Sequence, residues 1–143
     1  MFIGEYHHSI DQKGRLAIPA KFRASLSGGC VVTRGLDACL FLFTKAEWEK
    51  LAEKITNLPL SQANSRAFAR LMLAGAMDCD VDGQGRILLP DYLRRYGGFK
   101  RQIVVAGLST RLELWDAEAW AEYKRKTESS STAIAEQLGS LGV

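Results

Sequence analysis

Apolar and polar positions alternate along the chain in short blocks, and the same order of blocks occurs twice. In each copy a strand-like segment enters a polar turn containing glycine, and an apolar run closed by a proline follows. These turns and runs are residues 11–19, DQKGRLAIP, and residues 82–90, DGQGRILLP. Runs of this length between turn signals are typical of strands rather than helices. The pattern predicts two copies of one structural unit.

The repeat extends well beyond the two turns. A shift of 71 positions superposes Asp11 on Asp82, Gly14 on Gly85, Arg15 on Arg86, Pro19 on Pro90 and Arg23 on Arg94. Further along the chain the shift becomes 72, which implies a one-residue insertion, and the match continues to Trp48 and Trp120.

Each unit has the same expected order of elements. Strands are predicted at 5–10, 15–18, 30–35 and 39–43, and again at 76–81, 86–89, 102–107 and 112–115. Short helices are predicted at 19–26 and 90–97, because proline ends a strand and fits the first turn of a helix. Longer helices are expected at 44–58, 61–75 and 116–126, with Thr44 and Glu47 at capping-box spacing and Asp116 as an N-cap.

These elements define an expected domain plan. The first unit covers residues 5–51, the second covers 76–123, a connecting helix spans 52–75, and a serine-rich flexible tail occupies 127–143. The short strands of one unit leave exposed edges, so the two units are expected to pair strands and share a core. The expected fold is therefore α+β with pseudo-twofold symmetry and peripheral helices.

Composition narrows the class of protein only slightly. The 143 residues are 47% hydrophobic, with a net charge of +3, so only clustering of the basic residues would indicate a nucleic-acid partner. No signal peptide is visible, and the longest apolar run, 38–43, is far below the roughly 20 residues of a membrane span. A soluble, cytoplasmic protein is expected, with no membrane partner.

No residue pattern indicates catalysis, a metal or a cofactor. Cys30, Cys39 and Cys79 are an odd number without a CxxC pair, so they are expected to be reduced, partly buried thiols. His7 and His8 are adjacent on a strand and point to opposite faces, one exposed and one half-buried. Residues 78–89 resemble a calcium loop, but leucine stands where a bidentate glutamate is required. We expect a protein that is not an enzyme, without cofactors or a metal.

The repeated turns carry the residues best suited to binding. An aspartate at the turn entry can accept backbone N–H groups, and a glycine can supply a positive φ. Lys13 and Arg15 in the first copy, and Gln84 and Arg86 in the second, then stand at a rigid tip where they can contact guanine edges or phosphates. Each arginine can instead form an internal salt bridge to the aspartate four residues before it. Duplication favours two tips that face one partner.

Other basic residues lie close to the turns in sequence. Lys21, Arg23 and Arg94 are candidates for the same interface, and Arg95, Lys100 and Arg101 follow nearby.

The duplicated D-x-x-G-R-φ-x-φ-P unit, together with the opening MFIGEYHHSIDQKGRLAIPAKFR, resembles the MraZ family. These are bacterial transcriptional regulators built from two SpoVT-AbrB swapped-hairpin domains, and the resemblance covers residues 1 to about 125. It implies an interleaved AbrB-type β-barrel and ring-shaped homo-oligomers in the cytoplasm, associated with the nucleoid. It also implies binding to double-stranded DNA with tandem G-rich repeats, at the protein's own promoter and the adjacent division and cell-wall cluster.

Carried over by position, the DNA-facing residues implied by the resemblance are Lys13, Arg15, Gln84 and Arg86. In the second turn Gln84 replaces the lysine and Gly83 replaces Gln12, so that turn is expected to contact DNA less strongly, or only in some subunits of a ring. The first alternative function is an antitoxin-like interaction module whose basic turns bind an acidic partner. The second alternative is a small hydrolase or transferase.

Overall fold

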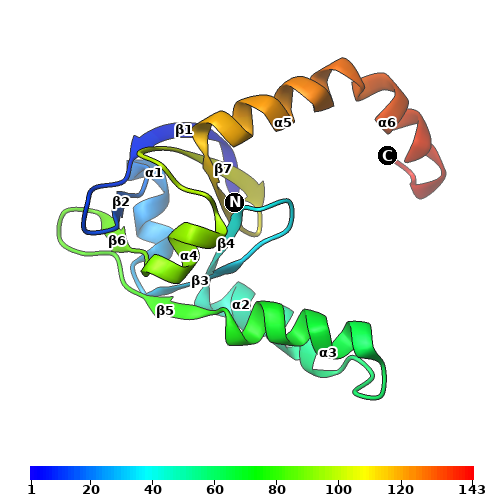
Figure 1. Ribbon diagram of the computed structural model, residues 1–143, viewed down its shortest axis with the longest axis horizontal. Coiled ribbons are helices and arrows are strands. Elements are labelled where there is room, and N and C mark those ends of the chain that lie inside the picture. Colours follow the sequence, from blue (N-terminus) through cyan, green and yellow to red (C-terminus); the bar gives the residue numbers. More distant parts are fainter.

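Eight strands and six α-helices make up the computed structural model, which describes residues 1–143 (Figure 1). The strands are β1 (Phe2–Ser9), β2 (Arg15–Ala17), β3 (Cys30–Arg34), β4 (Leu40–Thr44), β5 (Met77–Cys79), β6 (Arg86–Leu88), β7 (Gln102–Ser109) and β8 (Leu112–Asp116). The helices are α1 (Ala20–Arg23), α2 (Lys45–Thr56), α3 (Ala63–Ala69), α4 (Asp91–Tyr96), α5 (Ala117–Ser129) and α6 (Ser131–Gln137). Short 3-10 turns cover Ala24–Leu26 and Gly139–Leu141, and a π turn covers Arg70–Ala74.

The two repeats are woven into one antiparallel sheet. Its strand order is β1-β7-β8-β4-β3-β5, and β2 pairs with β6 in a separate two-stranded ribbon. The first strand of each repeat thus pairs with the third strand of the other, β1 with β7 and β5 with β3. If each strand is replaced by its counterpart in the other repeat, the same strand order is obtained, read from the opposite edge of the sheet. The topology therefore has twofold pseudosymmetry. The expected α+β class and the strand pairing between the units are confirmed.

The main hydrophobic core is built from both repeats. Seventeen buried residues form it, and equivalent positions from the two copies lie together, among them Leu16 and Ile87, Ile18 and Leu89, and Phe22 and Leu93. All six of these side chains are at most 2% exposed. Neither repeat could bury these side chains alone, because the apolar side chains of each repeat are covered by those of the other. Burial of such side chains is the main stabilising contribution to the fold.

A second, smaller core lies on the other side of the sheet and anchors the helices. Phe43, Ile55, Met72 and Trp115 are among its seven buried residues. The N-terminus of α2 is capped as expected, because the Thr44 hydroxyl accepts a hydrogen bond from the Glu47 N–H at 3.2 Å. The α5 helix begins in the same way, with Asp116 accepting from the Ala119 N–H.

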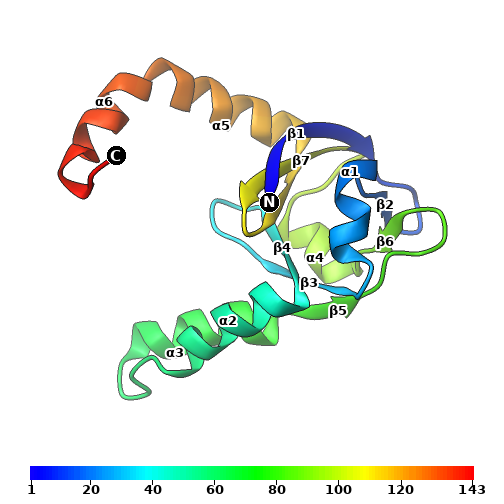
Figure 2. The same ribbon diagram turned by 180° about the vertical axis from the view of Figure 1, so that it is seen from behind.

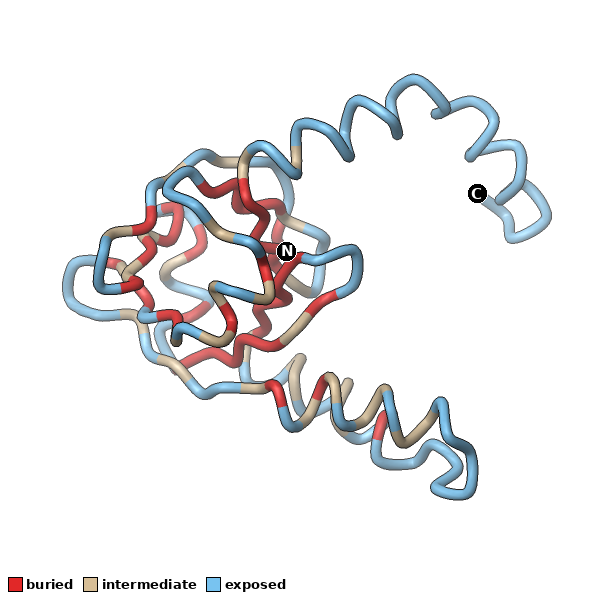
Figure 3. Tube along the Cα trace, viewed as in Figure 1, coloured by how far each residue is buried: buried red, intermediate tan, exposed pale blue.

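The connecting segment between the repeats contains the end of α2, a turn, and α3, which begins two residues later than expected and runs into the π turn. These two helices pack against each other and extend away from the sheet (Figures 1 and 2). The α5 and α6 helices form a second arm. Residues 127–143, expected as a flexible tail, are largely helical and exposed throughout (Figure 3), and their mobility stays a prediction.

Candidate nucleic-acid interface

The first turn, residues 11–15, connects β1 to β2 and is fixed by one carboxylate. The Asp11 Oδ1 atom accepts the backbone N–H groups of Lys13 and Arg15, both at 2.9 Å, and Oδ2 accepts the Arg15 Nε–H at 2.7 Å. Gly14 has a φ of 87°, a conformation that favours glycine. The side chain of Lys13 is therefore held at the tip of a rigid turn.

The second turn, residues 82–86, repeats this arrangement atom for atom. Asp82 accepts the backbone N–H groups of Gln84 at 2.8 Å and Arg86 at 2.9 Å, and the Arg86 Nε–H at 3.2 Å. Gly85 has a φ of 77°. The expected role of the repeated aspartates and glycines in fixing the turns is confirmed.

The internal salt bridges that the sequence left open are present in both turns. Asp11 pairs with Arg15, and Asp82 pairs with Arg86. Each pair uses the arginine Nε, while the side chains of Arg15 and Arg86 stay 34% and 27% exposed. The terminal Nη groups make no hydrogen bond within the protein. One arginine can thus hold its turn and still present donors to a partner.

Hydrogen bonding also sets the charge state of the turns. The N–H groups of Arg15 hold the pKa of the Asp11 carboxyl below its ordinary value, and those of Arg86 and Gln84 do the same for the pKa of Asp82. Both carboxyls are therefore ionised at neutral pH and attract the arginine beside them.

The lowered pKa of Asp11 predicts a stability effect that depends on pH. A lowered folded-state pKa stabilises the protein above the unfolded-state pKa of about 3.9, and this contribution is lost as the pH falls through the folded-state value. We expect Asp11→Asn to melt at a lower temperature than the wild type at pH 7, and the difference in melting temperature to shrink as the pH falls below the unfolded-state pKa. Calorimetric melting curves across that range measure it. A difference in melting temperature that is independent of pH would show that the charge of Asp11 does not contribute to the stability of the folded protein.

Each turn is locked by the other repeat. Leu89 N–H donates to the Gly14 carbonyl, and Ile18 N–H donates to the Gly85 carbonyl, both at 2.8 Å. Arg94 lies against Gly14 and donates from Nε to the Leu89 carbonyl at 3.1 Å.

Arg23 occupies the equivalent position beneath the second turn. It contacts Gly85 and donates to the Ile18 carbonyl at 2.9 Å. Arg23 and Arg94 are candidates for DNA contact from the sequence, and their supporting role is visible only in the structure, although both recur at the same distance after a recurring glycine. Their contact with DNA stays a prediction.

The remaining candidates are exposed. The side chains of Lys13 and Gln84 are exposed and make no hydrogen bond or ion pair. Lys21, on α1, is also exposed and lies over the Tyr6 ring, with Nζ 5.6 Å from the ring centre. Both turns project from the end of the molecule opposite the helical arms (Figures 1 and 2). A partner could therefore reach both turns from one side.

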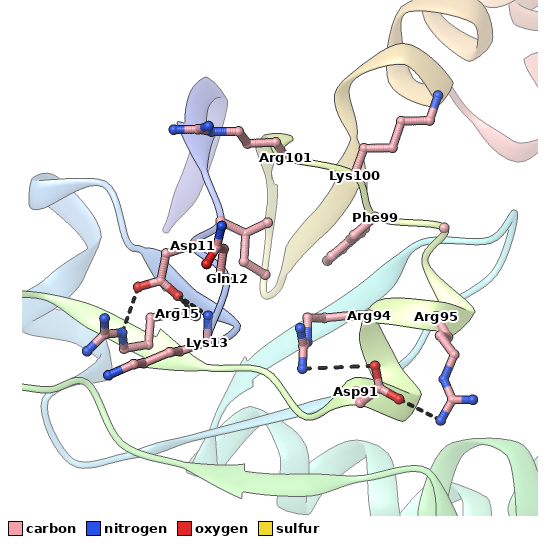
Figure 4. A pocket seen from close by; sticks show the side chains of 12 residues that line it. Asp11, Gln12, Lys13, Arg15, Asp91, Arg94, Arg95, Phe99, Lys100 and Arg101 are labelled. Atoms are coloured by element: carbon pink, nitrogen blue, oxygen red, sulfur yellow. Dashed lines mark hydrogen bonds and ion pairs between the residues drawn. The ribbon is translucent and has the colours of Figure 1, made fainter.

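The first turn borders a cleft of about 900 Å³ formed by both repeats (Figure 4). The first repeat contributes residues 10–13 and Arg15, and the second contributes side chains of α4 and the segment 98–101. Its basic residues are Lys13, Arg15, Arg94, Arg95, Lys100 and Arg101, and its acidic residues are Asp11 and Asp91. The cleft thus unites three of the candidates, Lys13, Arg15 and Arg94. Gln84, Arg86, Lys21 and Arg23 lie outside it.

Other candidate chemistry is sparse. No cluster of three or more His, Cys, Asp or Glu side chains has the geometry of a metal site. Cys30 and Cys79 face each other across β3 and β5 as free thiols, with their Sγ atoms 2.9 Å apart. His7 is exposed and His8 half-buried, as expected, and burial lowers the pKa of His8. None of the helices combines the length and apolar character needed to cross a membrane.

The fold and the interface together define an α+β protein of two interlocked repeats, each with an aspartate–arginine turn, of which the first borders a basic cleft. Comparison with known proteins agrees: the family model described as "MraZ protein, putative antitoxin-like" matches twice, over residues 1–71 and 72–140. The chain belongs to the MraZ family. It is 46% identical to the transcriptional regulator MraZ of Caldanaerobacter subterraneus subsp. tengcongensis over 100% of both chains. It is 48% identical to the transcriptional regulator MraZ of Moorella thermoacetica over 96% of each chain.

Proposed function

We propose that the protein is a sequence-specific DNA-binding transcriptional regulator rather than an enzyme. The observation that carries the proposal is the clustering of six basic side chains at the first turn. The cleft they line has a net charge of +4, more than the +3 of the whole chain, so the remaining residues are slightly acidic. Concentrated positive charge on one face is typical of a protein that binds nucleic acid.

In this proposal the residues of the two turns contact DNA bases, and the basic residues around the turns contact the sugar–phosphate backbone of the DNA. Lys13 and Arg15 contact guanine edges in the major groove, where arginine and lysine form favourable hydrogen bonds to O6 and N7. Gln84 and Arg86 make the weaker second contact. Lys21, Arg23 and Arg94 contribute positive charge near the phosphates.

The finer features of the proposal follow the family. The paired strands and the β2–β6 ribbon are proposed to form a swapped-hairpin β-barrel of two SpoVT-AbrB domains, residues 5–51 and 76–123. Several chains form a ring and engage tandem G-rich repeats at the protein's own promoter and the division and cell-wall cluster. Several weak contacts in one ring then give high overall affinity, because later contacts are intramolecular. Such a regulator acts in the cytoplasm at the nucleoid.

A mobility-shift experiment tests this function. The probe is double-stranded DNA from upstream of the protein's own coding sequence, and a shuffled fragment of the same composition is the control. We expect retention of the promoter fragment at lower protein concentration than the shuffled one. An interaction module, antitoxin-like as in the family description, is the second candidate. It predicts no preference for the promoter fragment and binding instead to an acidic protein.

The asymmetry between the turns gives a further prediction. Gln84 corresponds to Lys13 but carries no charge, and its side chain is exposed and unpaired. We expect Gln84→Lys to tighten promoter binding by about threefold or more, because one added cation near phosphates strengthens the electrostatic attraction. Fluorescence anisotropy with labelled promoter DNA measures the change. Unchanged or weaker binding would show that the second turn faces away from DNA.

A further inference from the structure

The basic cleft beside the first turn is preformed by contacts between the two repeats. The Ile10 N–H donates to the Arg101 carbonyl at 2.8 Å, which ties the start of the turn to the rim of the cleft. On the opposite wall, Arg94 lies against Gly14. The distance between the turn and the basic side chains of the second repeat is thus set by the folded backbone.

The basic residues of the cleft differ in how strongly they are engaged. Arg95 pairs with Asp91 at 2.6 Å, but its side chain is 76% exposed, so this weak surface pair leaves it accessible to a ligand. Arg94 lies 4.0 Å from the same carboxylate. Lys100 pairs with Glu118 of α5 at 2.7 Å. Arg101 is exposed and makes no ion pair, and Figure 4 shows its side chain extended above Asp11. Arg101 is therefore, like Lys13, a cation of the cleft that is free to contact a ligand.

The surplus of basic side chains lies on one side of the pseudo-twofold axis. The first-repeat residue equivalent to Arg95 is Ala24. In the strand register Cys30 and Ile103 are equivalent, opposite Thr44 and Asp116, so Lys100 and Arg101 correspond to Ser27 and Gly28. Next to Gly29 lie one basic and one acidic side chain, Lys45 and Asp80. The second turn therefore lacks the surplus positive charge that surrounds the first turn.

The chemistry of the cleft favours a phosphate backbone over a protein segment. Only two of its twelve lining residues, Ile10 and Phe99, are hydrophobic. Protein–protein interfaces usually have an apolar core, whereas interfaces with DNA are more polar and strongly positive.

We propose that the cleft binds the sugar–phosphate backbone of the DNA strand flanking the bases contacted by the first turn, with Arg101 and Arg95 as phosphate-contacting residues. This inference rests on the proposed DNA-binding function. Phosphate contacts fix the register of a protein on the duplex without reading sequence. The cleft thus positions Lys13 and Arg15, and it makes the first turn of each chain the dominant one.

The test measures binding of promoter and shuffled DNA at several salt concentrations by the full-length Arg101→Ala and Arg95→Ala variants. Arg125→Ala is the matched control, because Arg125 is exposed on α5 and pairs only with Glu122. We expect each cleft variant to weaken binding to both DNAs by a similar factor, about three- to tenfold at low salt. The slope of log K against log salt should fall by about 0.9 for each phosphate that the variant no longer neutralises. Arg125→Ala should match the wild type.

Several outcomes separate failure of the cleft from failure of the function. If the wild type prefers promoter DNA and Arg15→Ala weakens it, but both cleft variants bind like the wild type, the cleft proposal is wrong and the function stands. Weakening confined to promoter DNA would make Arg101 a base-reading residue and would also overturn the proposal. If the wild type binds neither DNA, the proposed function fails and the cleft proposal fails with it. Melting curves confirm folding, and Arg101→Glu, which reverses the charge, should enlarge the loss.

Discussion

Replacing Gly14 by alanine is expected to lower the free energy of unfolding by about 2 kcal/mol or more. Gly14 has a φ of 87°, and an added Cβ would lie 2.6 Å from the Leu89 carbonyl oxygen and 3.0 Å from the Arg94 guanidinium carbon. The backbone oxygen belongs to the other repeat, directly after β6, and Leu89 is held by its N–H hydrogen bond to the Gly14 carbonyl, so the oxygen cannot easily move away. Thermal or denaturant unfolding measures the loss.

Gly83→Ala is the matched control for this prediction. Gly83 lies in the second turn, but its φ is not positive, and no atom lies within 4 Å of an added Cβ. The equivalent position in the first turn holds Gln12, so a side chain fits there. We expect Gly83→Ala to unfold like the wild type. Equal stability of both variants would mean that the first turn is not rigid.

Arg15→Ala is expected to weaken promoter binding by about tenfold or more, since a bidentate arginine–guanine contact is worth roughly 1–3 kcal/mol. Arg86→Ala is the internal control, because Arg86 makes the same hydrogen bond and salt bridge in the second turn. Its effect on binding should be smaller, although both substitutions remove the same kind of intramolecular salt bridge. Anisotropy titrations and melting curves separate binding from folding. A larger loss of affinity for Arg86→Ala would reverse the assigned order of the turns.

The order of the elements could be predicted from the sequence because its signals are local. Glycine in each polar turn, Pro19 and Pro90 after the apolar runs, and the cap at Thr44 each act within a few residues. All eight strands are found within three residues of where these signals place them, although β1 begins earlier and β5 is shorter than predicted. The exchange of strands between repeats could not be assigned in detail, because a short apolar strand carries no information about its partner. Exposed edges indicated only that pairing must occur.

The structure of the two turns could be predicted from the sequence, but the cleft beside the first turn could not. Asp11 and Asp82 were expected to fix the turns and do so. The cleft was not foreseen, because Arg101 is 88 positions from Lys13 and approaches it only through the β1–β7 pairing. The roles of Arg23 and Arg94 were also missed, since supporting the glycine of the other repeat is a contact between units.

Some residues of the two repeats are the same and build the turns, and others differ and change the charge around them. Asp, Gly and the supporting arginine are common to both copies and build the same rigid turn twice. The residues around the turns differ: a lysine, Arg95 and Arg101 surround the first turn, and their counterparts around the second turn are uncharged. The shared residues stabilise both turns, and in our proposal the greater positive charge around the first turn makes it the main DNA contact.

Site-specific photo-crosslinking to promoter DNA would reveal which parts of the protein lie against the duplex. A photoactivatable side chain placed at position 13, 84 or 125 samples the first turn, the second turn and the helical arm without removing the supporting aspartates and arginines. We expect strong crosslinking from position 13, weaker crosslinking from position 84 and none from position 125. Retained promoter binding with no crosslink from position 13, or equal yields from 13 and 125, would show that the first turn is not the main DNA contact.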